Sequence, residues 1–352
     1  MHQLKRRGFN LGSTLKVSPS KPIDRDHNQL YEEKWSRGIP VKLVDLCDSK
    51  IEQYKPKIEK TELLVLNILE EKPVEELLLE PPYINQTKDR FSSLGTVFNE
   101  GDDQEIETVL FDQILGNSIL HEDLWMKVSW LSFYDNDVSI RFRFSFGTDL
   151  VEDVAADPGR QKASADLAEA IFPESAIITA NGQLIDFIKK LTGKKAPEFV
   201  ERIIYFNAPR GGAYLHHDVE RGHLGVVYAQ ISGSTFWLAL PQYELVNEII
   251  EFLDSNNWPS SLDAKARESL SQLQNDPILI SQALNSFAHN ELIHLINETE
   301  EFTQHLIKKG HSQTLEAGDV ILLPQKDQNT FCWHSVFCLG EEMGQALSFA
   351  IK

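Results

Sequence analysis

The sequence predicts an α+β fold in which short strands form a barrel or a sandwich and helices surround it. Two observations carry this prediction. From residue 201 to the end of the chain, short runs rich in β-branched and aromatic residues alternate with turn residues, which is typical of a β core. Between Pro241 and Gly318, apolar side chains instead recur at helical spacing and prolines separate the segments.

The first part of the chain is expected to support this core. Residues 1–35 are polar and predict an N-terminal arm. Residues 51–80 have a helical composition, in which Pro56 and Pro73 are expected to limit each helix. The apolar run 63–69 predicts a segment docked on the core, and it fits a buried helix or a buried strand equally well.

Two strands and two helices are predicted before the core. Residues 127–133 and 138–144 read as strands joined by the polar turn 134–137, and we expect them to extend one sheet. Residues 161–171 and 182–191 have the apolar spacing of amphipathic helices.

The core strands lie in two groups separated by a long insertion. We expect a helical insertion at residues 242–312, acting as a lid, a homodimer surface, a substrate-docking bundle or a packing appendage. The chain is thereby divided into an arm and helical support region, 1–115, and a barrel domain with its insertion, 116–352. The expected core strands are 201–207, 213–218, 224–231, 235–240, 315–324, 331–337 and 346–351.

A metal-binding pattern lies on these strands. His216 and Asp218 are two residues apart, so period-two alternation in a strand places both side chains on one face. His334, on a later strand, would complete a set of two histidines and one carboxylate, which suits non-haem Fe(II) and O2 chemistry. His217 is expected to point the other way, and His223 is the nearest rival ligand.

Four pieces in order resemble the cupin-type double-stranded β-helix, or jelly-roll barrel, of the 2-oxoglutarate-dependent Fe(II) oxygenases, and most closely the Jumonji-like hydroxylases. The pieces are the His-x-Asp pair, a Gln-Ile-x-Gly turn at 230–233, a Gly-Asp-Val-Ile-x-x-Pro segment at 318–324, and His334. The resemblance covers residues 200–352 apart from the insertion. It implies that His216, Asp218 and His334 bind Fe(II) and serve catalysis, with 2-oxoglutarate as co-substrate.

One departure concerns the co-substrate carboxylate. In the resembling family a lysine just after the Gln-Ile-x-Gly turn pairs with it, whereas this chain has Thr235 in that region and no cation. A buried dicarboxylate needs a cation or several donors, because an unpaired buried charge is costly. The candidate co-substrate contacts are therefore Arg210, Thr235, Tyr205, Ser348, Arg141 and Arg143, with Arg202 and Lys326 as further cations.

The resemblance implies hydroxylation of a protein, a peptide or an amino-acid-like small molecule. Two other functions stay open. The missing lysine favours a metal-dependent cupin enzyme that does not use 2-oxoglutarate, such as a dioxygenase or an isomerase. The third function is a non-catalytic binding protein that has kept the barrel. A test of metal binding would distinguish the non-catalytic binding protein from the two metal-dependent enzymes.

Composition limits the classes of partner and the cellular compartment that are expected for this chain. The 352-residue chain is 41% hydrophobic and 25% charged, as in an ordinary globular protein. Its formal net charge of -19 argues against a nucleic-acid partner. Three cysteines without a zinc pattern fit a reducing cytoplasm, and no apolar run predicts a membrane span.

Overall fold

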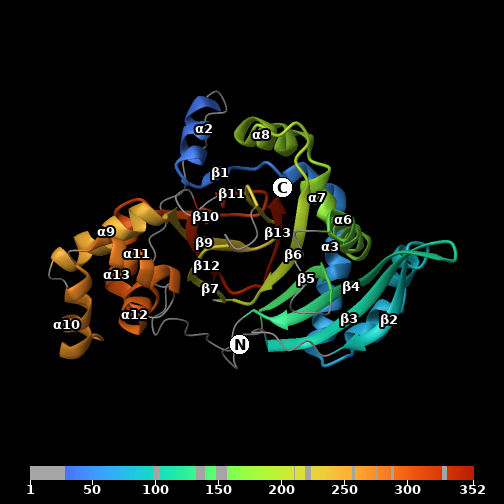
Figure 1. The fold of residues 1–352 in the computed structure, drawn as a ribbon. Helices are drawn as coiled ribbons and strands as arrows, with labels where there is room; N and C mark the ends of the chain where they lie inside the picture. Colours follow the sequence, from blue (N-terminus) through green and yellow to red (C-terminus); the bar gives the residue numbers. More distant parts are fainter. Residues whose placement is uncertain are drawn as a thin grey trace.

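The computed structural model describes residues 28–97, 104–131, 139–147, 157–209, 211–218, 223–255, 258–274, 276–286, 289–326 and 331–352. Two antiparallel sheets face each other in the middle of the molecule, with helices on both outer sides (Figure 1). The fold is therefore mixed α and β, with a sandwich-like core.

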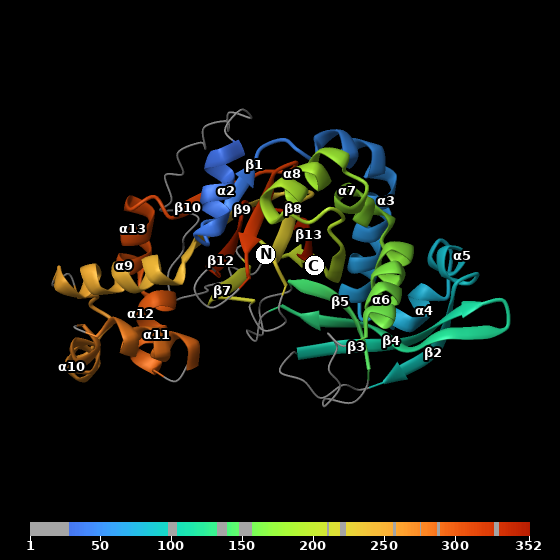
Figure 2. The same cartoon turned by 45° about the horizontal axis from the view of Figure 1, so that its top comes forward.

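The larger sheet has nine strands, and every neighbouring pair in it is antiparallel. Its far end, the hairpin-connected strands β2 to β5, reaches beyond the smaller sheet (Figure 2). In spatial order its strands are β1 (Val41–Leu43), β11 (Val320–Pro324), β8 (Gly225–Gln230), β13 (Gly344–Ile351), β6 (Phe199–Asn207), β5 (Ile140–Phe146), β4 (Ser118–Trp130), β3 (Gln104–Leu115) and β2 (Phe91–Val97).

The smaller sheet has four strands, and the chain passes repeatedly between the two sheets. The smaller sheet contains β10 (Ser312–Leu315), β9 (Ser234–Pro241), β12 (Cys332–Leu339) and β7 (Gly212–His216), in that order. The chain runs from β6 to β7, from β8 to β9, from β10 to β11 and from β12 to β13, changing sheets each time.

The closed barrel expected from the sequence is absent among the described strands. The large sheet continues past β6 through β5, β4, β3 and β2, and β6 does not pair with β7. The expected extension by the strands around residues 127–131 and 140–144 is confirmed, because β4 pairs with β5 and β5 pairs with β6. The predicted turn 134–137 lies outside the described residues.

Helices from the first half of the chain cover the outer face of the large sheet. Their buried side chains share one core with alternate residues of the strands, including Phe142, Phe144 and Phe206. These helices are α2 (Asn28–Ser36), α3 (Asp48–Leu69), α4 (Val74–Leu78), α5 (Tyr83–Thr87), α6 (Pro158–Ile171), α7 (Ala176–Thr179) and α8 (Gly182–Thr192). Helices α6 and α8 confirm the two amphipathic helices predicted from residues 161 and 182.

Helix α3 differs from its prediction in one respect, because it runs through Pro56 without ending. Pro56 and Glu52 both lie on the exposed side, so water can solvate the carbonyl that loses its partner. The helix resolves the ambiguity of the apolar run 63–69 as well. Leu64, Val65 and Ile68 are buried in the core.

The described residues of the predicted insertion form five helices, which pack on the outer face of the small sheet (Figure 1). Strand side chains such as Phe236, Leu238 and Trp333 share this second core with the helices. The stretch 278–307, which reads as one helical region in the sequence, divides into three helices. The five are α9 (Gln242–Asp254), α10 (Ala264–Leu273), α11 (Pro277–Ser286), α12 (Asn290–Glu298) and α13 (Glu300–Lys308).

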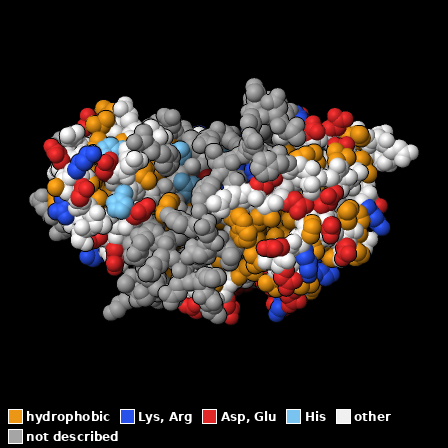
Figure 3. Space-filling model, turned by 90° about the horizontal axis from the view of Figure 1, so that it is seen from below, with side chains coloured by type: hydrophobic (Ala, Val, Ile, Leu, Met, Phe, Trp, Pro, Cys, Tyr) orange, Lys and Arg blue, Asp and Glu red, His pale blue; other side chains and the backbone are white. Residues whose placement is uncertain are grey.

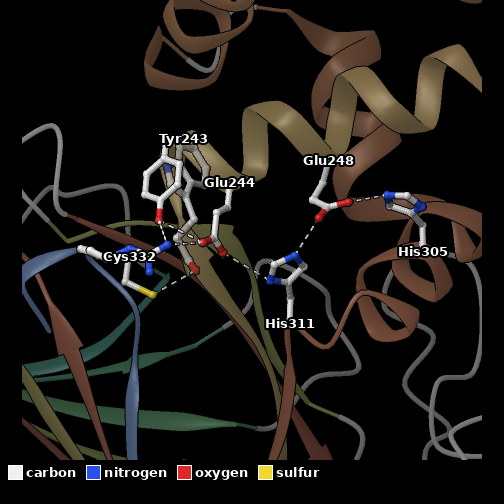
Figure 4. A network of polar contacts seen from close by, with 8 residues as sticks. Tyr243, Glu244, Glu248, His305, His311 and Cys332 are labelled. Carbon is white, nitrogen blue, oxygen red and sulfur yellow. Dashed lines mark hydrogen bonds and ion pairs between the residues drawn. The ribbon is translucent and has the colours of Figure 1, made fainter. Parts of the chain in front are cut away.

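A polar network ties the insertion to the small sheet (Figure 4). Glu248 of α9 accepts hydrogen bonds from Nε2 of His305, at 2.7 Å, and of His311, at 2.9 Å. One carboxylate thus joins α9, α13 and the residue that precedes β10. Tyr243 donates to the neighbouring Glu244 at 2.9 Å and accepts from Arg37, which extends the network toward the end of α2.

A buried ion pair fixes the junction of β1 with β11. The ammonium of Lys42 lies 2.7 Å from the carboxylate of Asp319, and both side chains are almost fully buried. Asp319 also accepts from the backbone N–H groups of Asp45 and Glu316. The preceding Gly318 has φ +96°, and an added Cβ would lie 1.8 Å from Asp48 Oδ1. The Gly-Asp pair of the sequence motif therefore shapes this turn.

Apolar side chains reach the surface on the strand extension. The exposed ones on β2 to β4 are Leu94, Leu115, Ile119 and Leu120. Figure 3 shows apolar side chains gathered in the right half of its view, where these strands lie.

The domain boundary expected at residue 115 falls at the turn between β3 and β4, and these two strands pair with each other.

Two further expectations concern cysteines and membranes. All three cysteines are unbridged and buried. Among the described residues, none of the helices combines the length and the apolar character needed to traverse a bilayer.

Candidate metal centre

The two histidines of the predicted ligand set lie opposite each other on paired strands. His216 is the last residue of β7, and in the register of β7 and β12 its partner is His334. Their ring centroids are 4.3 Å apart. Gly212 allows this pairing, because a Cβ there would lie 1.9 Å from the backbone oxygen of Val336. Residues 118 positions apart in the chain are therefore brought to one point.

Asp218 completes the group just beyond the end of β7. Its Oδ1 lies 3.8 Å from Nε2 of His216, and its Oδ2 lies 3.5 Å from Nε2 of His334. One ligand atom from each of the three residues lies within 4.8 Å of the others. The strand ends before Asp218, so the sequence argument from strict alternation holds only up to His216.

Backbone carbonyls fix the orientation of both imidazoles. Nδ1 of His216 is 2.7 Å from the carbonyl oxygen of Tyr214, and Nδ1 of His334 is 3.3 Å from that of Cys332. Because a carbonyl only accepts, the proton sits on Nδ1 in each ring. The Nε2 atoms then lie toward Asp218 and are the ring nitrogens available to a metal ion.

The electrostatics of the group favour a neutral imidazole at His334 and an ionised carboxylate at Asp218. Burial, together with the neighbouring His216, lowers the pKa of His334 to about 4, although Asp218 opposes this shift. Burial alone would raise the pKa of Asp218, but the charges of His334, His216, His217 and Arg143 hold it below its ordinary value. At neutral pH the donor set thus carries one negative charge at Asp218 and a neutral imidazole at His334.

The group opens into a cavity of about 350 Å³ between the two sheets. Trp237 stacks against His334 at a centroid distance of 5.8 Å and forms part of the wall. The wall is mainly apolar. Besides the candidate ligands, the large sheet contributes the polar residues Arg141, Tyr205, Asn207, Tyr228 and Ser348, and Tyr214 and Asn297 come from β7 and α12.

Three of the predicted co-substrate contacts line this cavity. They are Arg141, Tyr205 and Ser348, and the structure brings them together from β5, β6 and β13. Nε of Arg141 donates to the Ser129 hydroxyl at 3.1 Å, which orients the guanidinium. Tyr214 of β7 also lies in the wall.

The other predicted contacts lie elsewhere. Arg143 is absent from the cavity lining and acts on Asp218 only through its charge. Thr235 is fully buried outside the lining, where its hydroxyl donates to Gln230 at 2.8 Å and accepts from Trp237. Arg202 forms an ion pair with Glu169 at 2.8 Å. Arg210 lies outside the described residues.

The two other histidines near the candidate ligands, His217 and His223, do not belong to the ligand group. His217 points to the opposite side of the small sheet, as expected, with its ring 4.5 Å from that of Phe331. His223 lies 3.5 Å from Glu201 and does not join the ligand group. Cys332, two residues before His334, is fully buried, and burial raises the pKa of its thiol.

Sequence reasoning missed three polar residues of the cavity wall. Asn207 and Tyr228 lie on predicted strands, and alternation from Tyr205 and Val226 could have placed them. Burial raises the pKa of Tyr228, so its hydroxyl stays a donor at neutral pH. Asn297 comes from helix α12 of the insertion, and no local pattern in the sequence could have brought it to the cavity.

The residues present fit a divalent metal ion. Two imidazole nitrogens and one carboxylate oxygen converge, each imidazole is oriented by a carbonyl, and the group lies in the wall of a cavity. This donor set is typical of non-haem Fe(II) sites.

Comparisons with known proteins give little further guidance. No protein-family model matches the sequence, and no curated protein matches it. Among solved structures, the chain is similar to an oxidoreductase of the 2OG-Fe(II) oxygenase family from Burkholderia pseudomallei, at 7% identity over 96% of each chain. The TM-score is 0.32, so the inference about function rests on the site itself.

Proposed function

We propose that the protein is an Fe(II)- and 2-oxoglutarate-dependent oxygenase that hydroxylates a protein, a peptide or an amino-acid-like substrate. One observation carries the proposal. Nε2 of His216, Nε2 of His334 and the carboxylate of Asp218 converge within 4.8 Å at the wall of a cavity between the two sheets. Such a ligand set leaves coordination positions for a co-substrate and O2.

The strand order supports a double-stranded β-helix as the underlying fold. Strands β6 to β13 divide four to each sheet, in the orders β11-β8-β13-β6 and β10-β9-β12-β7. Eight strands in two facing four-stranded sheets are the pattern of a jelly roll. In this proposal β1 to β5 are additions to that core, and the ligands come from its second and seventh strands.

The polar side of the cavity supports 2-oxoglutarate as the co-substrate. Arg141 offers a planar fork that can bind a carboxylate with two hydrogen bonds. The hydroxyls of Tyr205, Tyr228 and Ser348 and the amide of Asn207 provide further donors around it. In this proposal Arg141 replaces the lysine that the resembling family has near the position of Thr235.

The chain's own residues would have three tasks. His216, Asp218 and His334 would hold the iron, which supplies the chemistry of O2 activation when it is bound. Arg141 and the neighbouring hydroxyls would orient the co-substrate in the cavity. The apolar wall, including Trp237 and Val226, would exclude water from the reacting groups.

Anaerobic titration tests this proposal. The apoprotein is loaded with Fe(II), and 2-oxoglutarate is then added while the visible spectrum is recorded. We expect a metal-to-ligand charge-transfer band that saturates at one equivalent and is absent from His216→Ala. If the wild-type protein binds iron and the band does not form, 2-oxoglutarate is not the co-substrate.

A second function is a metal-dependent cupin enzyme that does not use 2-oxoglutarate. The observation that favours it is the environment of Thr235, whose hydroxyl is already engaged by Gln230 and Trp237. Metal-dependent turnover without any keto acid would select this alternative.

A further inference from the structure

The strand that carries His216 lies at the edge of the small sheet. Strand β7 pairs with β12 along one side, and among the described strands none pairs with its other side. The backbone groups on that outer side therefore need partners from elsewhere in the fold. Leu215, the residue next to His216, has such an N–H group.

The partner of this N–H group is a side chain of the helical insertion. Oδ1 of Asn297, on α12, accepts from the backbone N–H of Leu215 at 2.8 Å. Asn297 is 2% exposed, so the bond is shielded from water. Because the N–H group requires an acceptor, the amide must present its oxygen to Leu215 and its NH2 group elsewhere.

The residues adjacent to the two histidine ligands are anchored in the same insertion. His216 and His334 line the cavity, and their chain neighbours Leu215 and Trp333 belong to the core that the insertion forms with the small sheet. Leu215 is therefore held in two ways, through its side chain by this core and through its backbone by Asn297. The helices thus pack directly against the chain neighbours of both histidines.

We propose that Asn297 is a positioning residue of the metal centre, through which the helical insertion fixes the strand that carries His216. This inference rests on the proposed metal centre and adds a role for the insertion. Asn297 binds the backbone of Leu215, the residue next to His216, and is not itself a candidate ligand. Partners of metal ligands commonly change metal affinity 10- to 100-fold when they are lost.

A metal titration with three matched variants tests the inference, using Co(II) alone as the probe. The visible bands of Co(II) report ligand number and geometry, which a general loss of stability does not alter. Asn297→Leu removes the acceptor, Asn297→Asp retains an acceptor oxygen at the same place, and Leu295→Ala removes buried apolar volume from α12. Thermal unfolding of each apoprotein is recorded in parallel.

We expect Asn297→Leu to weaken Co(II) binding about 10-fold or more and to change the band pattern. Asn297→Asp should restore both, and Leu295→Ala should lower the melting temperature with the spectrum unchanged. Should Asn297→Leu not fold, Asn297→Ala carries the same test. Unchanged affinity and spectrum in the variant that lacks the acceptor would overturn the positioning role while leaving the metal centre intact. Failure of the wild-type protein to bind Co(II) would instead overturn the metal centre, and this inference with it.

Discussion

His216 and His334 are register partners on β7 and β12, and Nε2 of each lies within 4 Å of a carboxylate oxygen of Asp218. In the sequence, β7 precedes the helical insertion and β12 follows it, and this pairing brings the two strands together. The sheet holds the two backbones, and Asp218 adds the third donor from the loop that follows β7.

Replacing any one ligand should abolish stoichiometric metal binding. His216→Ala, Asp218→Ala and His334→Ala each leave two donors, and we expect affinity for Fe(II) to fall at least 100-fold. His217→Ala is the matched control, because that ring lies on the other face against Phe331. The measurement is metal content after dialysis against a fixed free concentration. Equal loss in the control would mean that the effect is general unfolding.

Loss of the Arg141 guanidinium should weaken 2-oxoglutarate binding with little change in metal affinity. A charge-assisted bidentate contact is worth about 1.5–3 kcal/mol, so Arg141→Gln should raise the dissociation constant at least 10-fold. Arg143→Gln is the comparison, since Arg143 does not line the cavity. Titration of the charge-transfer band measures both variants. A larger effect of Arg143→Gln would place the co-substrate elsewhere.

Glu174 should make the protein less stable as the pH rises. Burial raises the pKa of this carboxyl group, although Thr61, its own backbone and Gln345 partly oppose the shift. Above the unfolded-state pKa of about 4.5, the unfolded chain releases the proton that the folded state retains. The stability conferred by the neutral acid is therefore complete below that pH and is lost as the pH rises through the folded-state pKa.

Glu174→Gln keeps the neutral form at every pH and should remove this dependence. We expect the variant to match the wild type near pH 4 and to exceed its unfolding free energy on the order of 1 kcal/mol near pH 8. Urea unfolding at both pH values provides the comparison. A variant that is less stable than the wild type at pH 8 would show that Glu174 is ionised in the folded state.

The buried pair of Lys42 and Asp319 should respond unequally to substitution of its two members. Asp319→Ala leaves the ammonium without its carboxylate and removes the acceptor of two backbone N–H groups. We expect a loss of about 3–5 kcal/mol. Lys42→Met should cost less, because those two N–H groups still stabilise the Asp319 carboxylate. Equal losses in urea unfolding would contradict this ranking.

The elements of the core could be predicted because their patterns are local. Runs of β-branched and aromatic residues with turn residues between them identified β6, β8, β9, β12 and β13. Strand β10 was missed, because Ser312–Leu315 is short and has no marked alternation. The open, nine-stranded sheet was foreseen only in part. Its extension by β4 and β5 was predicted, whereas β2 and β3 lie in the region expected to be a helical support.

The convergence of the three candidate ligands could be predicted, because His216 and Asp218 belong to one short motif and His334 is a histidine on a late strand. The sequence also predicted three residues that line the cavity, Arg141, Tyr205 and Ser348. Arg143 was predicted with Arg141 by alternation, but only Arg141 reaches the cavity. Asn297 could not be found, since its role depends on how α12 packs beside β7.

The most direct measurement is anomalous X-ray diffraction from crystals grown with Fe(II) under anaerobic conditions. The account predicts one anomalous peak per chain, about 2.0–2.3 Å from Nε2 of His216, from Nε2 of His334 and from a carboxylate oxygen of Asp218. The peak should vanish in His334→Ala. Full occupancy of iron at any other place, or no bound iron at saturating concentration, would contradict the account.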